Sequence, residues 1–375
     1  MTMRFSAPCL LGLEGLVANE LKFCGIENVK SENGRVLFEG DVSTLARANI
    51  SSRYAERILI LLDEFNATDF ETLFEKVKKI PWQDYIGIND AFPVKGSSVS
   101  SKLSSVPACQ KIIKKAVVEK LKERYNVSWF DETQTLVQIQ FLIFKDRVSI
   151  MLDTSGAGLH KRGYRENSNS APIRETLAAA MVDLSRVRSK HTVVDPFCGS
   201  GTILIESALK AMNIMPGVNR NFAFEEWGFI DKTLVEEERE RAKENEKRDC
   251  DFIAYGYDID SRALSLAKEN AQKAGVSEKI VFSQRDINDF EEDFDFCSVI
   301  TNPPYGERML DIEKAREIYG VMGKKFLQKP HHSYTIISPD EEFEKCFERV
   351  ADKKRKLYNG MIKCNVFMYY KGIDG

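Results

Sequence analysis

The run with the most specific chemistry is Asn302-Pro303-Pro304-Tyr305, which directly follows the apolar segment 295–301. Proline fixes the backbone and has no N–H donor, so two prolines leave carbonyl acceptors facing a cleft. The amide oxygen of Asn302 and the carbonyl of Pro303 can both accept from an exocyclic amine, holding its lone pair towards an incoming methyl group. Tyr305 offers an aromatic face on which an extruded base can stack. The alternative is a rigid turn that packs a core tyrosine.

A second segment with chemistry is the glycine-containing loop from Asp195 to Thr202, D-P-F-C-G-S-G-T. Its glycines let the backbone turn tightly and approach a ligand, and its strand-end carboxylate can accept hydrogen bonds. A P-loop is excluded because no lysine follows the second glycine, and a dinucleotide fingerprint is weak because Leu204 stands where a third glycine is expected. S-adenosylmethionine is the remaining cofactor class, and a purely structural turn is the alternative.

Two further carboxylates follow the next two predicted strands. Asp258 ends segment 252–258, and Asp286 follows segment 279–284. A carboxylate in the first position can receive both ribose hydroxyls of a nucleoside cofactor, and Asp286 can accept from an adenine amino group. A single aspartate after a strand is more often a turn or helix cap. Three acidic groups that end successive parallel strands instead indicate one binding edge.

The elements that must position these groups alternate regularly beyond Ala171, which predicts βαβ units and a parallel sheet with helices on both faces. Predicted strands lie at 191–195, 252–258, 279–284, 295–301 and 334–340, and predicted helices at 173–185, 201–212, 261–275 and 312–328. Segment 355–370 predicts two strands that form an antiparallel edge. Segment 213–250 is interpreted as an insertion, with an aromatic patch (Phe222, Phe224, Trp227, Phe229) followed by a solvated helix.

The first 155 residues predict an α+β region over an antiparallel sheet. The expected elements are an initial strand and amphipathic helix rather than a signal peptide, a strand at 34–40, a lysine-backed helix at 108–125, and two strands within 137–151 that turn at Lys145-Asp146. Segment 156–170 is basic and rich in glycine, serine and asparagine, so we interpret it as a linker. A second domain then covers 171–375.

Composition restricts the classes of protein that fit. The chain has 375 residues, 43% hydrophobic and 30% charged, which excludes a largely disordered chain. No run approaches the ~20 apolar residues of a membrane-spanning helix. The eight cysteines are scattered without a CxxC pair, which argues against a metal site and indicates the reducing cytoplasm. Segment 76–124 holds 11 basic and 4 acidic residues, which favours a phosphate-binding face over a merely solvated helix.

These motifs together resemble a known family. Residues 165–375 resemble a class I S-adenosylmethionine-dependent methyltransferase of the N-P-P-Y amino-methylating type. With L-H-K-R-G-Y-R at 159–165, A-P-I-R-E at 171–175 and N-P-P-Y-G-E-R at 302–308, the whole chain resembles the bacterial THUMP-domain RNA methyltransferases, in particular the large-subunit ribosomal RNA guanine-N2 methyltransferases. The resemblance implies a Rossmann-like, seven-stranded, mostly parallel sheet, a THUMP RNA-binding domain at about 44–155, and ribosomal RNA or a ribosome assembly intermediate as partner. Some family members fuse a second methyltransferase domain, so we expect only the guanine-N2 activity here.

The resemblance also assigns site residues. Catalytic roles fall to Asn302, Pro303, Pro304 and Tyr305. Cofactor contacts fall to Pro172, Asp195, Pro196, Phe197, Cys198, Gly199, Gly201, Thr202, Asp258, Ile259, Asp286, Ile287 and Asn302, with Arg162, Gly163 and Tyr164 flanking the pocket. We predict RNA contacts from Lys111, Lys114, Lys115, Lys120, Lys122, Lys161, Arg162 and Arg165. No metal is expected.

Three functions remain open at this point. The first is methylation of guanine N2 in RNA, and the second is methylation of adenine N6 in DNA or RNA, because the same motif serves any aromatic amine. The basic N-terminal region suits RNA better and offers no obvious recognition helix for a major groove. The third is a catalytically idle RNA-binding assembly factor, against which the intact Asn302 and glycine loop argue.

Overall fold

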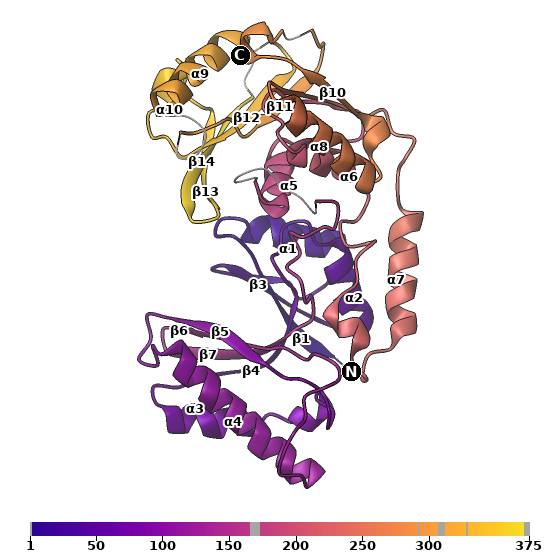
Figure 1. Cartoon of the computed structure of the whole chain (residues 1–375), viewed down its shortest axis with the longest axis vertical. Helices are drawn as coiled ribbons and strands as arrows, with labels where there is room; N and C mark the ends of the chain where they lie inside the picture. Colours follow the sequence, from indigo (N-terminus) through magenta and orange to yellow (C-terminus); the bar gives the residue numbers. More distant parts are fainter. Residues whose placement is uncertain (1, 166–172, 292, 307–311, 328, 371–375) are drawn as a thin grey trace.

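The computed structural model describes residues 2–165, 173–291, 293–306, 312–327 and 329–370, and it contains two seven-stranded sheets that follow each other along the chain (Figure 1). One hydrophobic cluster holds side chains from both halves, such as Phe5 and Phe141 from the first and Val193 and Ile300 from the second. The two halves therefore share a continuous core.

The N-terminal sheet is antiparallel except for its last strand pair. Its order is β2 (Lys30–Glu32), β3 (Arg35–Gly40), β1 (Met3–Pro8), β4 (Leu59–Asn66), β7 (Arg147–Asp153), β6 (Ile139–Phe144) and β5 (Val94–Val99). Its helices are α1 (Glu14–Phe23), α2 (Val42–Ser51), α3 (Phe70–Lys78) and α4 (Val106–Tyr125). Lys145 and Asp146 join β6 to β7 with φ of 52° and 63°, the left-handed pair of a two-residue hairpin turn. The predicted hairpin and the predicted lysine-backed helix are both confirmed.

The C-terminal sheet has the predicted doubly wound form. Its order is β10 (Ile280–Gln284), β9 (Ile253–Asp258), β8 (Thr192–Asp195), β11 (Cys297–Thr301), β12 (His332–Ser338), β14 (Ile362–Tyr369) and β13 (Lys353–Asn359). The first five strands are parallel, and β14 is antiparallel to both of its neighbours. Its helices are α5 (Glu175–Leu184), α6 (Thr202–Ala211), α8 (Ser261–Lys273), α9 (Ile312–Lys325) and the short α10 (Phe343–Cys346).

This strand order fixes where a ligand can enter. From β8 the chain winds outward through β9 to β10, and then returns to the other side of β8 to form β11. The connections on either side of β8 therefore leave the sheet in opposite directions. A crevice opens at such a switch point outside the carboxyl ends of the strands, and ligands of open α/β sheets bind there.

The helix of the 213–250 insertion, α7 (Lys232–Glu244), corrects the prediction of a solvated helix. One face of α7 is buried, including Val235 and Ala242, and the helix packs against α2 of the N-terminal half. The guanidinium group of Arg47 donates to both carboxylate oxygens of Glu238, at 3.1 and 2.6 Å. The high charge of the α7 sequence reflects its outer face together with this pairing.

The aromatic part of the same insertion also packs on the N-terminal half. The indole Nε1 of Trp227 donates to the backbone carbonyl of Leu136 at 3.0 Å, and the Phe229 ring meets the Tyr85 ring edge-on. Earlier in the insertion, the backbone N–H of Phe224 donates to the carbonyl of Thr154. The insertion therefore joins the two halves of the molecule.

Candidate active site

At the switch point, the side chains of two neighbouring strands are joined by a buried hydrogen bond. Asp195 ends β8 and Thr301 ends β11, and the Thr301 hydroxyl donates to Oδ1 of Asp195 at 2.7 Å. The same oxygen accepts from the backbone N–H of Phe197 at 3.1 Å. Burial raises the pKa of Asp195 to about 7, and the nearby Asp258 carboxylate adds to the rise, while the two hydrogen bonds oppose it. An acid titrating near neutrality thus lies at the centre of the crevice.

The glycine loop after β8 adopts the tight path that its sequence predicts. Gly199 and Gly201 have φ of 50° and 79°, in the left-handed region that favours glycine. A Cβ at Gly201 would lie 3.1 Å from the Cβ of Ala267. The side-chain amide of Asn270 donates to the carbonyl of Ser200 at 3.0 Å and holds the loop against α8. The backbone is thereby fixed close to the ligand edge.

Other predicted members of this loop turn into the protein. Pro196 is buried and Phe197 half-buried. Burial raises the pKa of the Cys198 thiol well above its usual range, so this side chain stays neutral. The Thr202 hydroxyl is buried and lies 3.2 Å from that of Ser200. Any contribution of Cys198 and Thr202 to a cofactor is therefore made through the backbone.

Asp258 carries a carboxylate with free acceptor capacity at the end of β9. Oδ2 accepts from the backbone N–H of Gly199 and Oδ1 from that of Asp260, both at 2.9 Å. A carboxylate offers about four lone-pair sites, so each oxygen can accept one more hydrogen bond. The next residue, Ile259, is 65% exposed. This places an apolar surface beside two acceptor oxygens, an arrangement that suits a nucleoside.

Asp286 combines the two roles weighed for it from the sequence. It is exposed, and its Oδ1 accepts from the backbone N–H of Asn288 at 2.8 Å, which caps the short turn at Ile287–Asp289. No hydrogen bond to Oδ2 is found within the described part of the chain. Ile287 is buried beneath the turn. Asp286 is therefore a turn cap that keeps one oxygen for a ligand.

The Asn302–Tyr305 run leaves β11 beside Asp195. Oδ1 of Asn302 is buried and has no hydrogen-bond partner among the described residues. No backbone hydrogen bond from those residues ends on the carbonyl of Pro303, whereas the carbonyl of Pro304 accepts from the Tyr319 hydroxyl at 3.3 Å. The Tyr305 hydroxyl accepts from the Nδ2 amide of Asn359 at 2.6 Å. The two acceptors predicted to hold an amine are thus the ones left open.

These groups fit S-adenosylmethionine together with an amine substrate. Asp195 and Asp258 end two adjacent strands, Asp286 closely follows the third, and the glycine loop bends around the first two. Asn302, whose buried oxygen has no partner among the described residues, directly follows the fourth strand. A buried acceptor without a partner is costly in a folded protein, so its presence indicates a ligand that donates to it.

Comparison with protein families gives three matches along the chain. An RMKL-like methyltransferase domain matches residues 162–367, a THUMP domain residues 67–153, and an RlmL ferredoxin-like domain residues 4–59. The chain belongs to the RMKL-like methyltransferase family. The prediction of a methyltransferase with a Rossmann-like domain, a THUMP domain and S-adenosylmethionine as cofactor is therefore confirmed at the level of the family.

Individual relatives agree with this placement. YpsC of Bacillus subtilis, an RNA methyltransferase by name, is 43% identical over 99% of this chain and 96% of its own length. Ribosomal RNA large subunit methyltransferase K/L of Psychromonas ingrahamii is 33% identical over 96% of this chain, which spans only 49% of that relative.

Two solved structures share the whole architecture. One is described as a predicted N6-adenine-specific DNA methylase from Listeria monocytogenes, with 42% identity, a TM-score of 0.93, and coverage of 99% of this chain and 96% of that one. The other is SMU.472, a methyltransferase by name, in complex with S-adenosylhomocysteine, with 40% identity, a TM-score of 0.92, and coverage of 100% and 99%.

Two arginines predicted to bind nucleic acid instead form ion pairs inside the protein, where Arg162 is buried and Arg165 half-buried. The Arg162 side chain lies 3.4 Å from the buried Glu206 carboxylate and donates to backbone carbonyls, including that of Arg53. Arg165 pairs with Glu175 at 2.9 Å and donates to a backbone carbonyl. Both guanidinium groups are paired with glutamates inside the protein, which argues against the predicted contact with RNA.

The other predicted residues of this segment differ in their exposure. The Tyr164 hydroxyl donates to Glu206 at 3.1 Å, Gly163 has a φ of 99°, and Lys161 is exposed. Residues 155–165 form no helix or strand, but Leu159 and Tyr164 are buried. Pro172 lies outside the described residues.

The predicted lysines of α4 in the THUMP domain differ in availability. Lys111 and Lys115 are exposed. Lys114 pairs with Glu132 at 2.6 Å, and burial lowers its pKa. Lys120 and Lys122 each pair with a glutamate on the same helix at 3.1 Å. Lys111 and Lys115 are thus the α4 lysines best placed for a phosphate.

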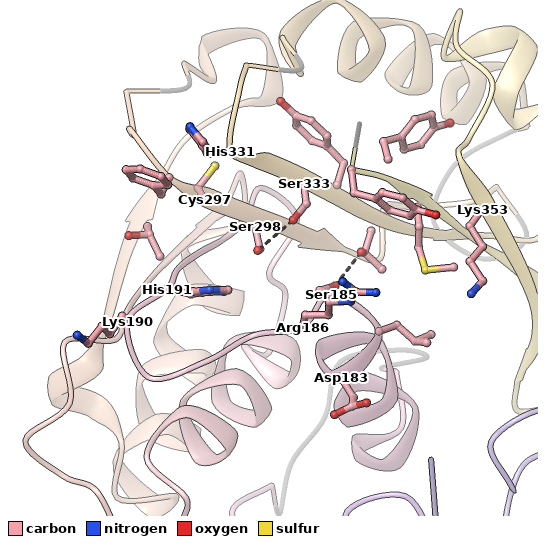
Figure 2. A pocket seen from close by; sticks show the side chains of 18 residues that line it. Asp183, Ser185, Arg186, Lys190, His191, Cys297, Ser298, His331, Ser333 and Lys353 are labelled. Atoms are coloured by element: carbon pink, nitrogen blue, oxygen red, sulfur yellow. Dashed lines mark hydrogen bonds between the residues drawn. The ribbon is translucent and has the colours of Figure 1, made fainter. Parts of the chain in front are cut away.

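The methyltransferase domain also has a cleft away from this site, of about 680 Å³ (Figure 2). It lies at the amino ends of β11 and β12, where Ser298 and Ser333 meet, and beside the end of α5 at Ser185. The opposite, carboxyl edge of the sheet carries the residues described above. No described residues form a group of histidine, cysteine and acidic side chains able to hold a metal, and no described helix is long and apolar enough to cross a membrane.

The sequence did not reveal the residues whose hydrogen bonds hold the Asn302–Tyr305 run in place. The Tyr319 hydroxyl accepts from Ser338 and donates to Pro304, and Asn359 contacts Tyr305. Thr301 was identifiable as the last strand residue before Asn302. The dipeptide Asn359-Gly360 signalled a hairpin turn, but only the strand order places that turn beside Tyr305.

Proposed function

We propose that this methyltransferase transfers a methyl group from S-adenosylmethionine to the exocyclic amine of a base in RNA, namely N2 of a guanine in large-subunit ribosomal RNA. The observation that carries the proposal is the buried Oδ1 of Asn302, which lacks a partner among the described residues and lies beside the open carbonyl of Pro303.

The chemistry required of these residues is positioning. When bound, S-adenosylmethionine supplies a methyl group that is electrophilic because it is attached to a sulfonium. The amine nitrogen of guanine is a weak nucleophile because its lone pair is delocalised into the ring. Asn302 Oδ1 and the Pro303 carbonyl each accept a hydrogen bond from one N–H of the amine and so orient its lone pair towards the methyl carbon. Such orientation can supply a large part of the rate enhancement. Tyr305 stacks on the extruded base.

Support for RNA as the substrate comes from the N-terminal half. It contains a THUMP domain match and a helix, α4, with exposed lysines. The relatives that match nearly all of this chain include one named as an RNA methyltransferase and one named for ribosomal RNA of the large subunit. The chain covers about half of the latter, so the assignment of the guanine-N2 reaction to this chain is part of the proposal.

A second candidate is methylation of adenine N6, which the description of the Listeria monocytogenes structure favours. The same two acceptors suit the amine of either base, because both are planar aromatic amines. The THUMP match and the exposed lysines of α4 in the N-terminal half favour RNA over DNA as the substrate.

The test is transfer of labelled methyl groups into unmodified 23S ribosomal RNA and, in parallel, into duplex DNA, with nucleoside analysis of the products. We expect N2-methylguanosine in RNA. Label recovered as N6-methyladenine would establish the second candidate. Absence of label from both, with cofactor binding intact, would refute both in favour of an idle binding factor.

A further inference from the structure

The hairpin formed by β13 and β14 has a basic surface that the mechanism above does not use. Residues 353–363 include five basic and no acidic side chains. We propose that the outer face of this hairpin, formed by Lys356, Tyr358 and Lys363, binds the RNA strand on either side of the target nucleotide. The lysines bind phosphates and Tyr358 stacks on a neighbouring base. This inference rests on the proposed function, because it takes the substrate to be RNA.

The hairpin is tied directly to the catalytic motif. Asn359, the last residue of β13, donates to the Tyr305 hydroxyl at 2.6 Å. Tyr358 adjoins Asn359, and Lys363 is paired directly opposite Tyr358 in the strand register. Because side chains alternate along a strand, Asn359 and its contact with Tyr305 lie on the side of the hairpin opposite Tyr358. An RNA strand that leaves a nucleotide stacked on Tyr305 therefore reaches this face by passing the hairpin tip.

The three side chains share one face of the sheet. Residues two apart on a strand point to the same side, which groups Lys356 with Tyr358. Directly opposite residues of an antiparallel pair also share a face, which adds Lys363. The intervening Leu357 and its partner Cys364 point the other way and are buried. An aromatic ring between two cations is the pattern of single-strand binding surfaces.

The face is open to a ligand. Lys356 and Lys363 are exposed, and neither has an ion pair among the described residues, in contrast to Lys354, which pairs with Glu344 at 2.7 Å. Tyr358 is 38% exposed, and Met361 at the tip is 97% exposed. Exposed apolar side chains beside unpaired cations favour a partner with both flat rings and phosphates.

Protection of a sheet edge is the competing explanation, because lysines on edge strands prevent unwanted strand pairing. It accounts for the cations of β13, the last strand of the sheet. It does not account for Lys363, which lies on the inner strand β14, or for the exposed ring of Tyr358.

The hairpin also reaches the N-terminal half. In Figure 1 it projects from the upper sheet towards the lower part of the molecule. A Cβ at Gly12, in the loop before α1, would lie 3.3 Å from the carbonyl oxygen of Lys356. The hairpin therefore lies between the catalytic motif and the half that contains the THUMP domain.

The test compares RNA affinity as a function of salt for four full-length proteins. These are the wild type, the hairpin variant Lys356→Gln/Lys363→Gln, the charge-conserving Lys356→Arg/Lys363→Arg, and the control Lys243→Gln/Lys268→Gln, which changes exposed lysines of α7 and α8 outside the hairpin. The probe is an unmodified fragment of 23S ribosomal RNA. Loss of two single-strand phosphate contacts should flatten the slope of log affinity against log salt by about 1.4.

We expect the arginine variant and the control to keep the wild-type slope and all four proteins to keep their S-adenosylmethionine affinity, which shows that the fold is intact. Tyr358→Leu should weaken RNA binding roughly tenfold without changing the slope. If the glutamine variant matches the control while the wild type binds RNA, this inference is refuted and the proposed function stands. If the wild type binds the RNA no better than duplex DNA of equal length, both are refuted.

Discussion

Replacement of Asn302 by alanine should abolish turnover without harming the fold. The residue directly follows β11, and its Oδ1 is buried with no partner among the described residues. Alanine therefore breaks no hydrogen bond made by that oxygen, and it removes a buried acceptor whose lack of a partner costs about 1–3 kcal/mol in a folded protein. We expect the free energy of unfolding to stay constant or to rise by up to about 1 kcal/mol, since some packing is lost with the amide.

The effect on the reaction should be much larger than the effect on stability. Loss of one preorganised hydrogen-bonding group that orients or stabilises the reacting centre slows enzymes by about 10²–10³, or roughly 2.7–4 kcal/mol. The affinity for S-adenosylmethionine should remain within about twofold of wild type, because Asp195, Asp258 and Asp286 are unchanged and an effect of this size corresponds to less than ~0.5 kcal/mol.

The assay combines single-turnover methyl transfer, calorimetric titration of the cofactor and chemical denaturation. A matched control is Asn270→Ala, which removes another buried asparagine of the same domain, one whose amide holds the Ser200 carbonyl. That variant should lose stability and cofactor affinity together. If Asn302→Ala keeps more than about a tenth of the wild-type rate, a cost below ~1.4 kcal/mol, the role assigned to its oxygen is wrong.

Three further predictions concern the carboxylate Asp195, the 213–250 insertion and helix α4. Burial raises the pKa of Asp195 from its ordinary value near 4 to about 7. Between those pH values the acid is ionised in the unfolded chain but not in the folded one, so the stability of the fold decreases as the pH rises. Thr301→Val removes the hydroxyl that donates to Asp195 and should extend the fall in Tm above pH 7, and an unchanged Tm profile from pH 5 to 9 would contradict this. Trp227→Ala should cost about 3–5 kcal/mol in unfolding free energy, because its indole is buried where the insertion meets the N-terminal half; an unchanged denaturation midpoint would show that the contact is not stabilising. Lys111→Gln/Lys115→Gln should reduce RNA affinity and its salt dependence, and equal slopes for variant and wild type would remove α4 from the RNA-binding surface.

The acidic side chains of the site could be predicted because their placement follows from topology. Asp195, Asp258 and Asp286 each end a segment that reads as a parallel strand, and the carboxyl ends of parallel strands meet at one edge. The sequence does not reveal which of them is buried. Asp195 ends a central strand and is buried, whereas Asp286 follows the outermost strand and is exposed.

The basic residues were less predictable because charge in a sequence does not reveal its partner. Arg162 and Arg165 stand in a polar segment that reads as solvent-exposed, yet both are neutralised by glutamates of helices farther along the chain. The helix α7 misled for the same reason, because Glu238 on its charged surface meets Arg47 across the interface with the N-terminal half. Such pairings depend on the packing of whole elements, which periodicity in one segment cannot supply.

The hydrogen bond between Thr301 and Asp195 links the cofactor loop to the residues that bind the amine. It crosses from β11, which delivers the amine acceptor Asn302, to β8, which opens the cofactor loop. A change in the charge or position of the Asp195 carboxylate is therefore transmitted to the residue immediately before Asn302. Each strand leads to a buried polar atom that the protein satisfies incompletely: the anion of Asp195, at the end of β8, is disfavoured by burial, and the oxygen of Asn302, directly after β11, has no partner in the described structure. Such groups destabilise the site when no ligand is bound, so a cofactor that offsets the charge of Asp195 and an amine that donates to Asn302 both gain affinity from them. Because the Thr301 hydrogen bond couples the two residues, binding of the cofactor and binding of the amine substrate should favour each other.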